Sequence, residues 1–491
     1  MTNPFAGLEP VEMWRWFDEI TRIPRESRNE KGIRDWLSRW AVEHGCERSI
    51  DATGNIVIRV KASPGREGTP IVVLQGHMDM VCEKNSDVTF DFAKEPIQAY
   101  IDGDFVRARG TTLGADNGIG IAASLAAVTD PRIVHGPLEL LFTVDEETGL
   151  TGATRIEGDA LKGRILLNLD SEEDGTIYVG CAGGGDNHTA LTVKRVPAPA
   201  RKAAYRIRVS GLKGGHSGLN IIENRANAIR LVARYLRASL DTIRGKVLLV
   251  SVDGGDKHNA IPREASAVIH ASTRAGGALR KLAKALRKDA LAEYAGVDPD
   301  IEITVEDLAD RPADAIHKKD GARVVSLLLA IPHGVETMSR DIPGLVETSN
   351  NLASIRTQGD KITILTSSRS SVMPALQAIR DRIAAAGHLA GAVVEAHGGY
   401  PAWQPNMKSK LLKVAREVYS AEFGKDARVT AIHAGLECGI IGDKFEGMEM
   451  ISFGPNLMGV HSPEERVQIS TTATFYRFFR SLLLKLAEKR S

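Results

Sequence analysis

The sequence predicts an α/β protein in which a mainly parallel sheet, with helices on both faces, is interrupted by an inserted α+β domain. Short apolar strands alternate with helical stretches near both ends of the chain. The middle of the chain instead has a β-α-β-β-α-β rhythm. A Pro/Ala-rich stretch at 196–200 lies where one pattern gives way to the other. At 491 residues, the chain is long enough for more than one domain.

The outer domain is expected to comprise residues 1–198 and 398–491. In its first part the apolar pattern predicts amphipathic helices within 10–40, a helix at 119–128, and strands at 56–60, 71–74, 138–144 and 165–169. The same alternation returns after residue 398, with helices at 408–423 and 472–488 and a strand at 448–453. The two parts therefore read as one domain that the inserted segment divides.

The inserted domain, residues 199–397, is expected to contain two copies of a split βαβ unit. The first copy has strands at 205–209, 247–252, 265–270 and 301–305 and helices at 223–240 and 279–294. The rhythm recurs with helices at 322–330 and 373–385 and strands at 352–355, 362–366 and 392–395. HNAIPREASAVIHASTR (258–274) and NNLASIRTQGDKITILTSSR (350–369) are also alike, with Asn near the start and Arg after a strand. This internal similarity predicts a duplication.

Composition excludes several classes of protein. The formal net charge is +1, which gives no reason to expect a nucleic-acid or membrane partner. No apolar run approaches the ~20 residues that a membrane helix needs, and the N-terminus lacks the pattern of a signal peptide. The four cysteines form no CxxC pair, which argues against zinc knuckles, disulfides and thiol redox chemistry. Reduced thiols in a cytoplasmic protein are expected.

Polar side chains follow the apolar strands at their ends. Each has an ordinary interpretation, such as a surface turn, a helix cap or a solvated loop acid. Together they supply two imidazoles and several carboxylates, the ligands that zinc or manganese prefers. The ligands suffice for two ions bridged by one carboxylate, and dications would balance the three acids in a row at 145–147. The residues are His77, Asp79, Asp116, Glu146, Glu147, Asp170 and His461.

Eight motifs resemble the co-catalytic zinc peptidases of the aminoacylase/carboxypeptidase clan, and within it the aminoacyl-histidine (Xaa-His) dipeptidases. They are GHMDMV, TTLGADNGIGIA, TVDEETGLTGA, NLDSEEDG, GLKGGHSG, NAIPREA, HAGLECG and VHSPEE, spread over nearly the whole chain. The resemblance implies that the outer domain is catalytic and that the inserted domain is a lid. It also implies two divalent metal ions, most simply zinc, with manganese or cobalt as alternatives.

The resemblance assigns a role to each strand-end residue. It implies that His77 and Asp170 bind one ion and that Glu147 and His461 bind the other. Asp116 would bridge the two ions and be followed by a peptide that relatives often hold in cis. Asp79 would orient His77 from behind, and Glu146 would be the general base.

The resemblance also implies contacts between the lid and the substrate. His216 in GGHSG matches the imidazole that stabilises the oxyanion, although a loop histidine in a glycine turn is the alternative. Asn259, Arg369 and Gly435 match positions that hold the dipeptide. Asn351 and Arg274 occupy comparable places in the other copy, and the spacing does not decide which copy faces the substrate. It also leaves open whether His216 acts within its own chain or across a homodimer formed through the lid.

The expected activity is therefore hydrolysis of dipeptides, preferentially Xaa-His dipeptides, by a metal-activated water with Glu146 as base. Another amidohydrolase of the clan (a tripeptidase, desuccinylase or N-acyl-amino-acid hydrolase) is the alternative. A non-catalytic metal-binding homologue is a third interpretation. It predicts loss of the base, whereas the sequence keeps Glu146 beside Glu147.

Overall fold

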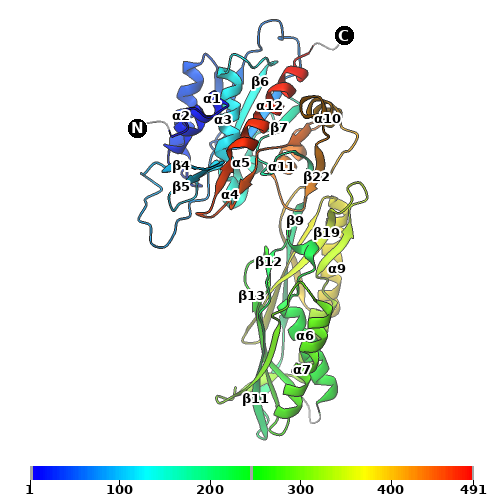
Figure 1. The fold of residues 1–491 in the computed structure, drawn as a ribbon. Coiled ribbons are helices and arrows are strands. Elements are labelled where there is room, and N and C mark those ends of the chain that lie inside the picture. The colour runs from blue at the N-terminus through cyan, green and yellow to red at the C-terminus, as the bar shows by residue number, and fades with distance from the viewer. Residues whose placement is uncertain (1–3, 244–246, 489–491) are drawn as a thin grey trace. The chain divides into compact units, whose positions relative to one another are not determined.

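The computed structural model describes residues 4–243 and 247–488. The chain forms two compact units (Figure 1). Unit 1 comprises Met1–Cys181, Trp403–Ala431 and Leu436–Ser491, and unit 2 comprises Ala182–Ala402 and Ile432–Gly435. In the described part of the chain, no helix is both long and apolar enough to cross a membrane.

Unit 1 is built on a mixed sheet of eight strands. Its four central strands are parallel, whereas β1, β2 and β8 run antiparallel to their neighbours. The sheet is therefore mixed, with the expected parallel strands at its centre and antiparallel strands on both sides. The short turn between β1 and β2 accounts for the antiparallel pairing of these two strands. In spatial order the strands are β1 (Glu47–Ile50), β2 (Ile56–Val60), β6 (Leu138–Thr143), β3 (Val72–His77), β7 (Ile165–Asn168), β23 (Glu449–Ser452), β8 (Thr176–Cys181) and β22 (Arg428–Ile432).

Helices pack against this sheet, with α3 in contact with both α1 and β3. The α3 sequence, ADNGIGIAASLAAVT, is rich in small and apolar residues and is buried almost throughout, which suits a helix packed between two neighbours. The helices are α1 (Val11–Thr21), α2 (Lys31–Glu43), α3 (Ala115–Thr129), α4 (Glu146–Gly149), α5 (Thr151–Arg155), α10 (Lys410–Phe423), α11 (Glu437–Lys444) and α12 (Ile469–Leu486). A smaller sheet contains β24 (Leu457–Met458), β25 (Arg466–Gln468), β5 (Phe105–Ala108) and β4 (Ala99–Asp102).

Unit 2 contains a separate sheet in which every pairing is antiparallel. Its strands are, in order, β16 (Glu302–Leu308), β11 (Lys202–Ser210), β15 (Ala265–Ser272), β13 (Leu248–Gly255), β19 (Val346–Gln358), β20 (Lys361–Ser370), β9 (Gly183–Thr192) and β21 (Val393–Tyr400), with β18 (Gly334–Met338) beside β19. The helices α6 (Ala228–Thr242), α7 (Gly276–Glu293), α8 (Lys318–Ala330) and α9 (Met373–Leu389) accompany it.

The two halves of this sheet have equivalent strand orders. In chain order β11, β13, β15 and β16 are strands one to four of the first half, and in space they lie 4-1-3-2. The second half, β21-β9-β20-β19, also lies 4-1-3-2 if β9 is its first strand. The halves meet where β13 pairs with β19. β9 thus precedes the first half in the chain but belongs to the second half in space.

The boundary of unit 2 differs from the expected one for the same reason. The unit begins at Ala182 rather than at 199, because β9 pairs with β20 and β21. The stretch at 196–200 lies within the unit, and part of it forms β10 (Arg195–Pro197), which pairs with β17 (Asp314–Ile316). The other end lies after Ala402 rather than at 397, because β21 continues to Tyr400.

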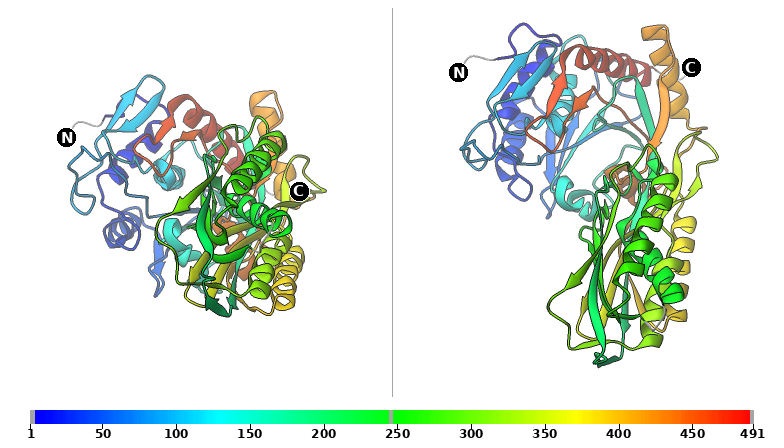
Figure 2. Two further views of the ribbon diagram at one scale, coloured as in Figure 1. Left: turned by 90° about the horizontal axis from the view of Figure 1, so that it is seen from below. Right: turned by 60° about the horizontal axis from the view of Figure 1, so that its bottom comes forward.

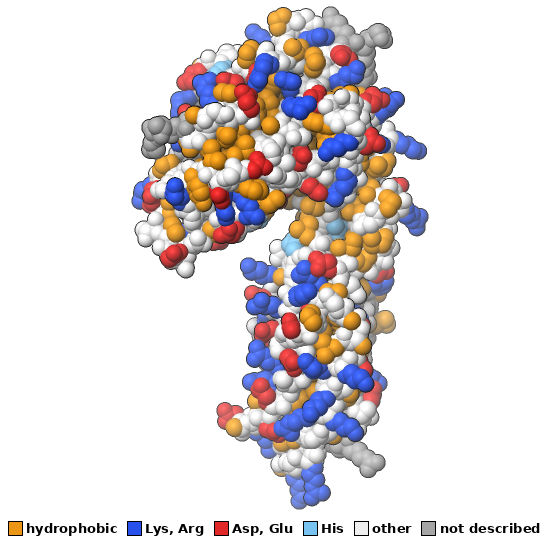
Figure 3. Space-filling view, viewed as in Figure 1, with side chains coloured by type: hydrophobic (Ala, Val, Ile, Leu, Met, Phe, Trp, Pro, Cys, Tyr) orange, Lys and Arg blue, Asp and Glu red, His pale blue; other side chains and the backbone are white. Residues whose placement is uncertain are grey.

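One face of the unit 2 sheet is covered by its helices, as the two views in Figure 2 show. In β11 the apolar residues Tyr205, Ile207 and Val209 are buried, whereas the intervening Arg206 and Arg208 are exposed. On the face shown in Figure 3, acidic and basic side chains are interspersed over both units, in keeping with the formal net charge of +1.

Candidate metal centre

The parallel strands of unit 1 bring their carboxyl ends to one edge of the sheet, and His77 is the last residue of β3. Its side chain is 1% exposed. Nε2 of His77 lies 2.9 Å from Oδ1 of Asp116 and 3.3 Å from Oδ1 of Asp170. A single ring nitrogen therefore faces two carboxylates, which is an arrangement typical of ligands around a cation.

Asp116 lies at the start of α3, where the chain has not yet adopted helical dihedral angles. The peptide between Asp116 and Asn117 is cis, as the resemblance implies. Oδ1 of Asp116 faces His77, and Oδ2 lies 3.3 Å from Nε2 of His461. Each oxygen of one carboxylate thus points toward a different imidazole, which is the geometry expected of a bridging ligand.

Glu147 and His461 complete the other side of the cluster. Nε2 of His461 lies 3.0 Å from Oε2 of Glu147. The Glu147 side chain is 4% exposed, whereas that of His461 is 52% exposed. The cluster is therefore buried on the side of His77 and open on the side of His461.

Three overlapping groups of these side chains have ligand atoms within 4.8 Å of one another: His77, Asp116 and Asp170; His77, Glu146 and Glu147; and Asp116, Glu147 and His461. Two carboxylate oxygens in these groups are buried and make no hydrogen bond: Oε1 of Glu147, and Oδ1 of Asp170, which has only the His77 ring nitrogen 3.3 Å away. A buried, unpaired carboxylate oxygen is costly, and a cation removes that cost. The donor set and the unpaired oxygens both fit divalent metal ions.

The pKa values reflect the burial and the crowding of carboxylates in this cluster. Burial raises the pKa of Asp170 to about 6, with the charges of Asp116 and Glu147 adding to the effect. Burial also raises the pKa of Glu146 well above its usual value, and Asp170 contributes. Hydrogen bonds to Asp116 and Glu147 raise the pKa of His461 to about 11. Bound protons reduce the repulsion among these buried carboxylates, and divalent cations would reduce the same repulsion.

Asp79 organises the cluster from behind. It is fully buried, and its Oδ1 lies 3.4 Å from Nδ1 of His77. Its carboxylate accepts the backbone N–H groups of Glu146 (3.1 Å) and Glu147 (3.2 Å) and the hydroxyl of Ser27 (2.7 Å). Burial opposes its charge, but the nearby His77 ring and the hydrogen bonds from Ser27 and the Glu146 amide lower its pKa to about 2. Asp79 therefore fixes both a ring and the turn that carries two carboxylates.

Further buried groups in unit 1 were not singled out by the sequence analysis. Oε2 of Glu437 accepts from Nε2 of Gln75 (2.6 Å) and from Oγ1 of Thr143 (2.7 Å), and burial raises the Glu437 pKa to about 7. Glu465 and Arg25 are also buried, beside the Asp116 turn. Glu437 and Glu465 lie in the motifs HAGLECG and VHSPEE, but the sequence does not indicate which groups they bind.

Unit 2 holds the remaining candidates. His216 is in β12 (Gly215–His216), whose partner strand is β14 (Ala260–Ile261), and the carbonyl of Asn259 accepts from the Ser217 amide at 2.8 Å. Nδ1 of His216 accepts the backbone N–H groups of residues 218 and 219. Burial, with the charges of Arg369 and His258, lowers the pKa of His216 to about 4. His216 is therefore neutral near pH 7.

Arg369 and Gly435 contact the same tyrosine. Nη1 of Arg369 donates to the Tyr400 hydroxyl at 2.7 Å, and the arginine is 8% exposed. A Cβ atom on Gly435 would lie 2.7 Å from the Tyr400 ring, so only glycine fits there. The structure therefore groups Arg369, Tyr400 and Gly435.

Asn351 and Arg274, the comparable positions in the other copy, have different surroundings. Nδ2 of Asn351 donates to the carbonyls of His258 (3.1 Å) and Ala260 (2.8 Å), so that this buried amide supports the loop carrying Asn259. Arg274 is exposed after the end of β15.

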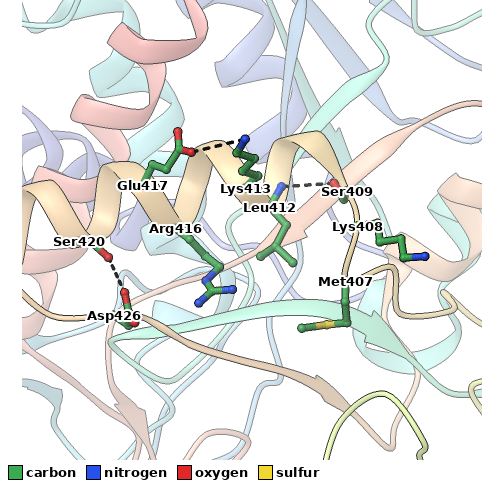
Figure 4. Close-up of a pocket in the computed structure, with 9 residues that line it drawn as sticks. All are labelled: Met407, Lys408, Ser409, Leu412, Lys413, Arg416, Glu417, Ser420 and Asp426. Carbon is green, nitrogen blue, oxygen red and sulfur yellow. Dashed lines mark hydrogen bonds and ion pairs between the residues drawn. The ribbon is translucent and has the colours of Figure 1, made fainter.

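A separate surface cavity of about 600 Å³ lies beside α10 in unit 1 (Figure 4). Its lining side chains include Lys413 and Glu417, which pair with each other, and Ser420 and Asp426, which share a hydrogen bond. None of the predicted site residues lines it.

The chain is similar to known peptidases over nearly its full length. It is 39% identical to the cytosol non-specific dipeptidase of Escherichia coli (strain K12), over 99% of this chain and 100% of that protein. It is also 39% identical to the aminoacylhistidine dipeptidase of Vibrio alginolyticus, whose crystal structure matches with a TM-score of 0.90 over 99% of both chains. The fold alone is shared with the aminopeptidase PepT of Bacillus cereus ATCC 10987, at 15% identity and a TM-score of 0.56 over 98% and 100% of the two chains.

The profile described as "Peptidase family M20/M25/M40" matches residues 73–485, which include all the ligand groups described above. A match over most of the chain, together with relatives of this identity and coverage, shows the family. The chain belongs to the peptidase family M20/M25/M40.

Proposed function

We propose that the protein is a two-metal dipeptidase that hydrolyses dipeptides, preferentially those with histidine at the leaving end. The main support for this proposal is the geometry of Asp116, whose two carboxylate oxygens each face a different imidazole. The names of the Escherichia coli and Vibrio alginolyticus relatives support a dipeptidase, and the second supports histidine. We extend the cytosolic location named for the Escherichia coli protein to this chain.

His77 and Asp170 would hold one divalent ion, Glu147 and His461 the other, and Asp116 both. The buried oxygens of Glu147 and Asp170, which have no hydrogen-bond partner, support this assignment. Zinc suits imidazole and carboxylate ligands, and manganese or cobalt are alternatives that metal analysis of purified protein distinguishes. When bound, the ions supply the positive charge that acidifies a water molecule and polarises the peptide carbonyl.

Glu146 is the proposed general base. It lies beside the ligand Glu147, and its amide is fixed by Asp79. Its raised pKa suits a carboxylate that takes a proton from the attacking water and passes that proton to the departing amine. Asp79 would act by holding His77 and the turn that carries Glu146.

Unit 1 is the proposed catalytic domain and unit 2 the proposed lid. We infer that unit 2 arose by duplication of a split βαβ unit, because both halves of its sheet have the same strand order. One complete copy would be inserted after β9, the first strand of the other copy.

The lid residues His216, Asn259, Arg369 and Gly435 are the proposed substrate contacts. A neutral His216 can donate a hydrogen bond from Nε2 to a developing oxyanion, because its Nδ1 already accepts two backbone N–H groups. Arg369 would bind the terminal carboxylate, for which a planar guanidinium is well suited. Gly435 would act by letting the Tyr400 ring pack closely against its backbone, beside Arg369.

The test is histidine release from β-alanyl-histidine and from matched Xaa-His and Xaa-Leu dipeptides, by zinc-loaded wild type and Glu146→Gln. Activity that favours Xaa-His and is lost in the variant, with zinc retained, supports the proposal. Cleavage of N-acyl amino acids or tripeptides in place of dipeptides would instead identify another amidohydrolase. Zinc binding without any hydrolysis would indicate a non-catalytic homologue.

A second experiment tests the proposed homodimer. Light scattering gives the mass in solution, and mixing Glu146→Gln with His216→Ala tests where the histidine acts. Restored activity in the mixture requires that His216 of one chain serves the metal centre of another. Without restoration, His216 acts within its own chain.

A further inference from the structure

Glu465 is a buried carboxylate on the loop that carries His461. The two residues are four positions apart, and Glu465 is 2% exposed. Its carboxylate accepts the backbone N–H groups of four consecutive residues, 113–116, at 2.8, 3.0, 2.7 and 3.3 Å. The last of the four is Asp116. One side chain therefore links the loop of one candidate ligand to the backbone of another.

These four amides have no partners of their own in the helix. They lie at the entrance to α3, where the first N–H groups of a helix lack intrahelical acceptors. Asp116 and Asn117 also depart from helical dihedral angles, which interrupts the usual pattern further. Glu465 supplies the acceptor for all four N–H groups, two at each of its oxygens.

Arg25 holds the same turn through the carbonyl group of Gly114. Its fully buried guanidinium donates to the carbonyl of Gly114, and also to those of Met78 (3.1 Å) and Asp79 (2.7 Å). A buried anion thus binds the N–H groups of the turn, and a buried cation binds its carbonyl and the segment that follows β3. The turn that presents Asp116 is fixed from both sides.

We propose that Glu465 is a positioning residue that sets Asp116 and His461 in register, and so determines how tightly the metal centre binds its ions. This inference rests on the proposed two-metal function. Both Asp116 and His461 belong to the ligand group that they form with Glu147, and both lie on segments that Glu465 joins. Asp116 also belongs to the group of His77 and Asp170, so Glu465 supports one ligand of that group but two of the group that contains Glu147.

The substitution Glu465→Gln isolates this role. The amide keeps one acceptor oxygen, but its NH₂ group replaces the other and faces two N–H donors. The turn must shift to relieve two opposed donors, and Asp116 moves with it. Changes behind metal ligands typically weaken metal affinity about 10- to 100-fold, and we expect a loss in that range for the weaker of two zinc ions.

Two variants of the same chain serve as controls. Glu139 is also a carboxylate that is 2% exposed, and it accepts the N–H groups of Lys162 (2.9 Å) and Gly163 (3.0 Å). It lies near the start of β6, at the opposite end of the strand from Thr143, so Glu139→Gln removes a similar buried cap away from the metal centre. Glu464 is 69% exposed and pairs with Arg107, so Glu464→Gln controls for a charge lost from the His461 loop.

The experiment measures zinc affinity by competition with a chromogenic chelator, and thermal unfolding of the metal-free proteins. Weaker zinc binding by Glu465→Gln, beside wild-type affinity in both controls, supports the proposal. Wild-type affinity in Glu465→Gln, or an equal loss in Glu139→Gln, overturns it. If Glu465→Gln does not fold, Glu465→Asp decides in the same way, because its shorter side chain keeps the charge but does not reach all four amides.

The wild type separates this inference from the proposed function. If the wild type fails to bind two zinc ions, the two-metal function is wrong and the role of Glu465 falls with it. If the wild type binds two ions and cleaves dipeptides while Glu465→Gln binds zinc equally well, only the positioning role is wrong.

Discussion

Replacing Asp79 by Asn tests how the metal centre is supported. The carboxylate accepts hydrogen bonds from Ser27 and from the amides of Glu146 and Glu147, all in a fully buried position. The variant loses at least one charge-assisted hydrogen bond and turns a buried NH₂ group toward a donor, which should cost about 2–4 kcal/mol of unfolding free energy.

The pKa of Asp79 gives a second route to the magnitude. A fall from 3.8 to about 2 on folding corresponds to about 2–3 kcal/mol of stability. Because the folded-state pKa is the lower one, this contribution is fully present above about pH 4 and is lost as the pH falls through 2. At pH 7 the Asn variant therefore lacks all of it, and the two routes agree.

Urea unfolding of the metal-free proteins measures this loss, and Asp298→Asn is the matched control. Asp298 is fully buried in unit 2 and accepts the N–H groups of Lys213 (2.7 Å) and Ala226 (2.8 Å). Both variants should lose stability, but only Asp79→Asn should also weaken zinc binding, by about 10- to 100-fold. The reasoning is refuted if Asp79→Asn is as stable as the wild type, or if the two variants bind zinc equally well.

Three further outcomes are expected. Glu146→Gln should lower kcat by at least about 100-fold, because it removes the proposed base, while zinc stoichiometry measured by metal analysis stays at the wild-type value. Tyr400→Phe should raise KM about tenfold with kcat nearly unchanged, because Arg369 loses a hydrogen-bond partner; steady-state kinetics would contradict this if kcat fell instead. Burial, with the charge of Arg230, lowers the pKa of His333 to about 3, and Nδ1 of the neutral ring accepts the Leu352 amide. As the pH is lowered from about 6.5 to about 3, the unfolded chain takes up a proton at this histidine before the folded chain does. The unfolding free energy should therefore fall by up to ~1.4 kcal/mol per pH unit over this range. His333→Gln should flatten that slope in urea titrations over this pH range, and an unchanged slope would assign the proton uptake elsewhere.

The candidate metal ligands could be predicted because a local rule locates them. Each follows an apolar strand or lies in a glycine-rich or Ser-Pro turn, and parallel strands bring such positions to one edge of a sheet. The structure places His77, Asp116, Asp170, Glu147 and His461 within overlapping groups there. Buried residues that support the ligands without binding metal, such as Glu465, could not be predicted in the same way. The partners of Glu465 are backbone amides hundreds of residues away in sequence, which leave no side-chain signature.

The fold was predictable for elements with clear periodicity and not for β9. Its sequence, GGGDNHTALT, begins with three glycines, which weaken any strand signal. If β9 is not recognised as a strand, the second half of the unit 2 sheet lacks its first strand, and the predicted start of the unit falls after β9. The start of α6 also differs from the prediction of 223–240, because the helix begins only at Ala228, after η1 (Ile221–Glu223) and the cap residue Asn227.

The pairing of β9 with β21 has a consequence for how unit 2 is joined to the rest of the chain. The strands that begin and end its main segment are neighbours, and just outside them Cys181 and Trp403 exchange two backbone hydrogen bonds, of 2.9 and 3.1 Å. A tight turn between these two residues would therefore excise that whole segment without stretching unit 1. The excised segment would lack Ile432–Gly435, which the chain supplies only after it has returned to unit 1. The main segment of unit 2 thus begins and ends at adjacent residues, whereas Gly435 reaches unit 2 only through a second, later crossing of the chain.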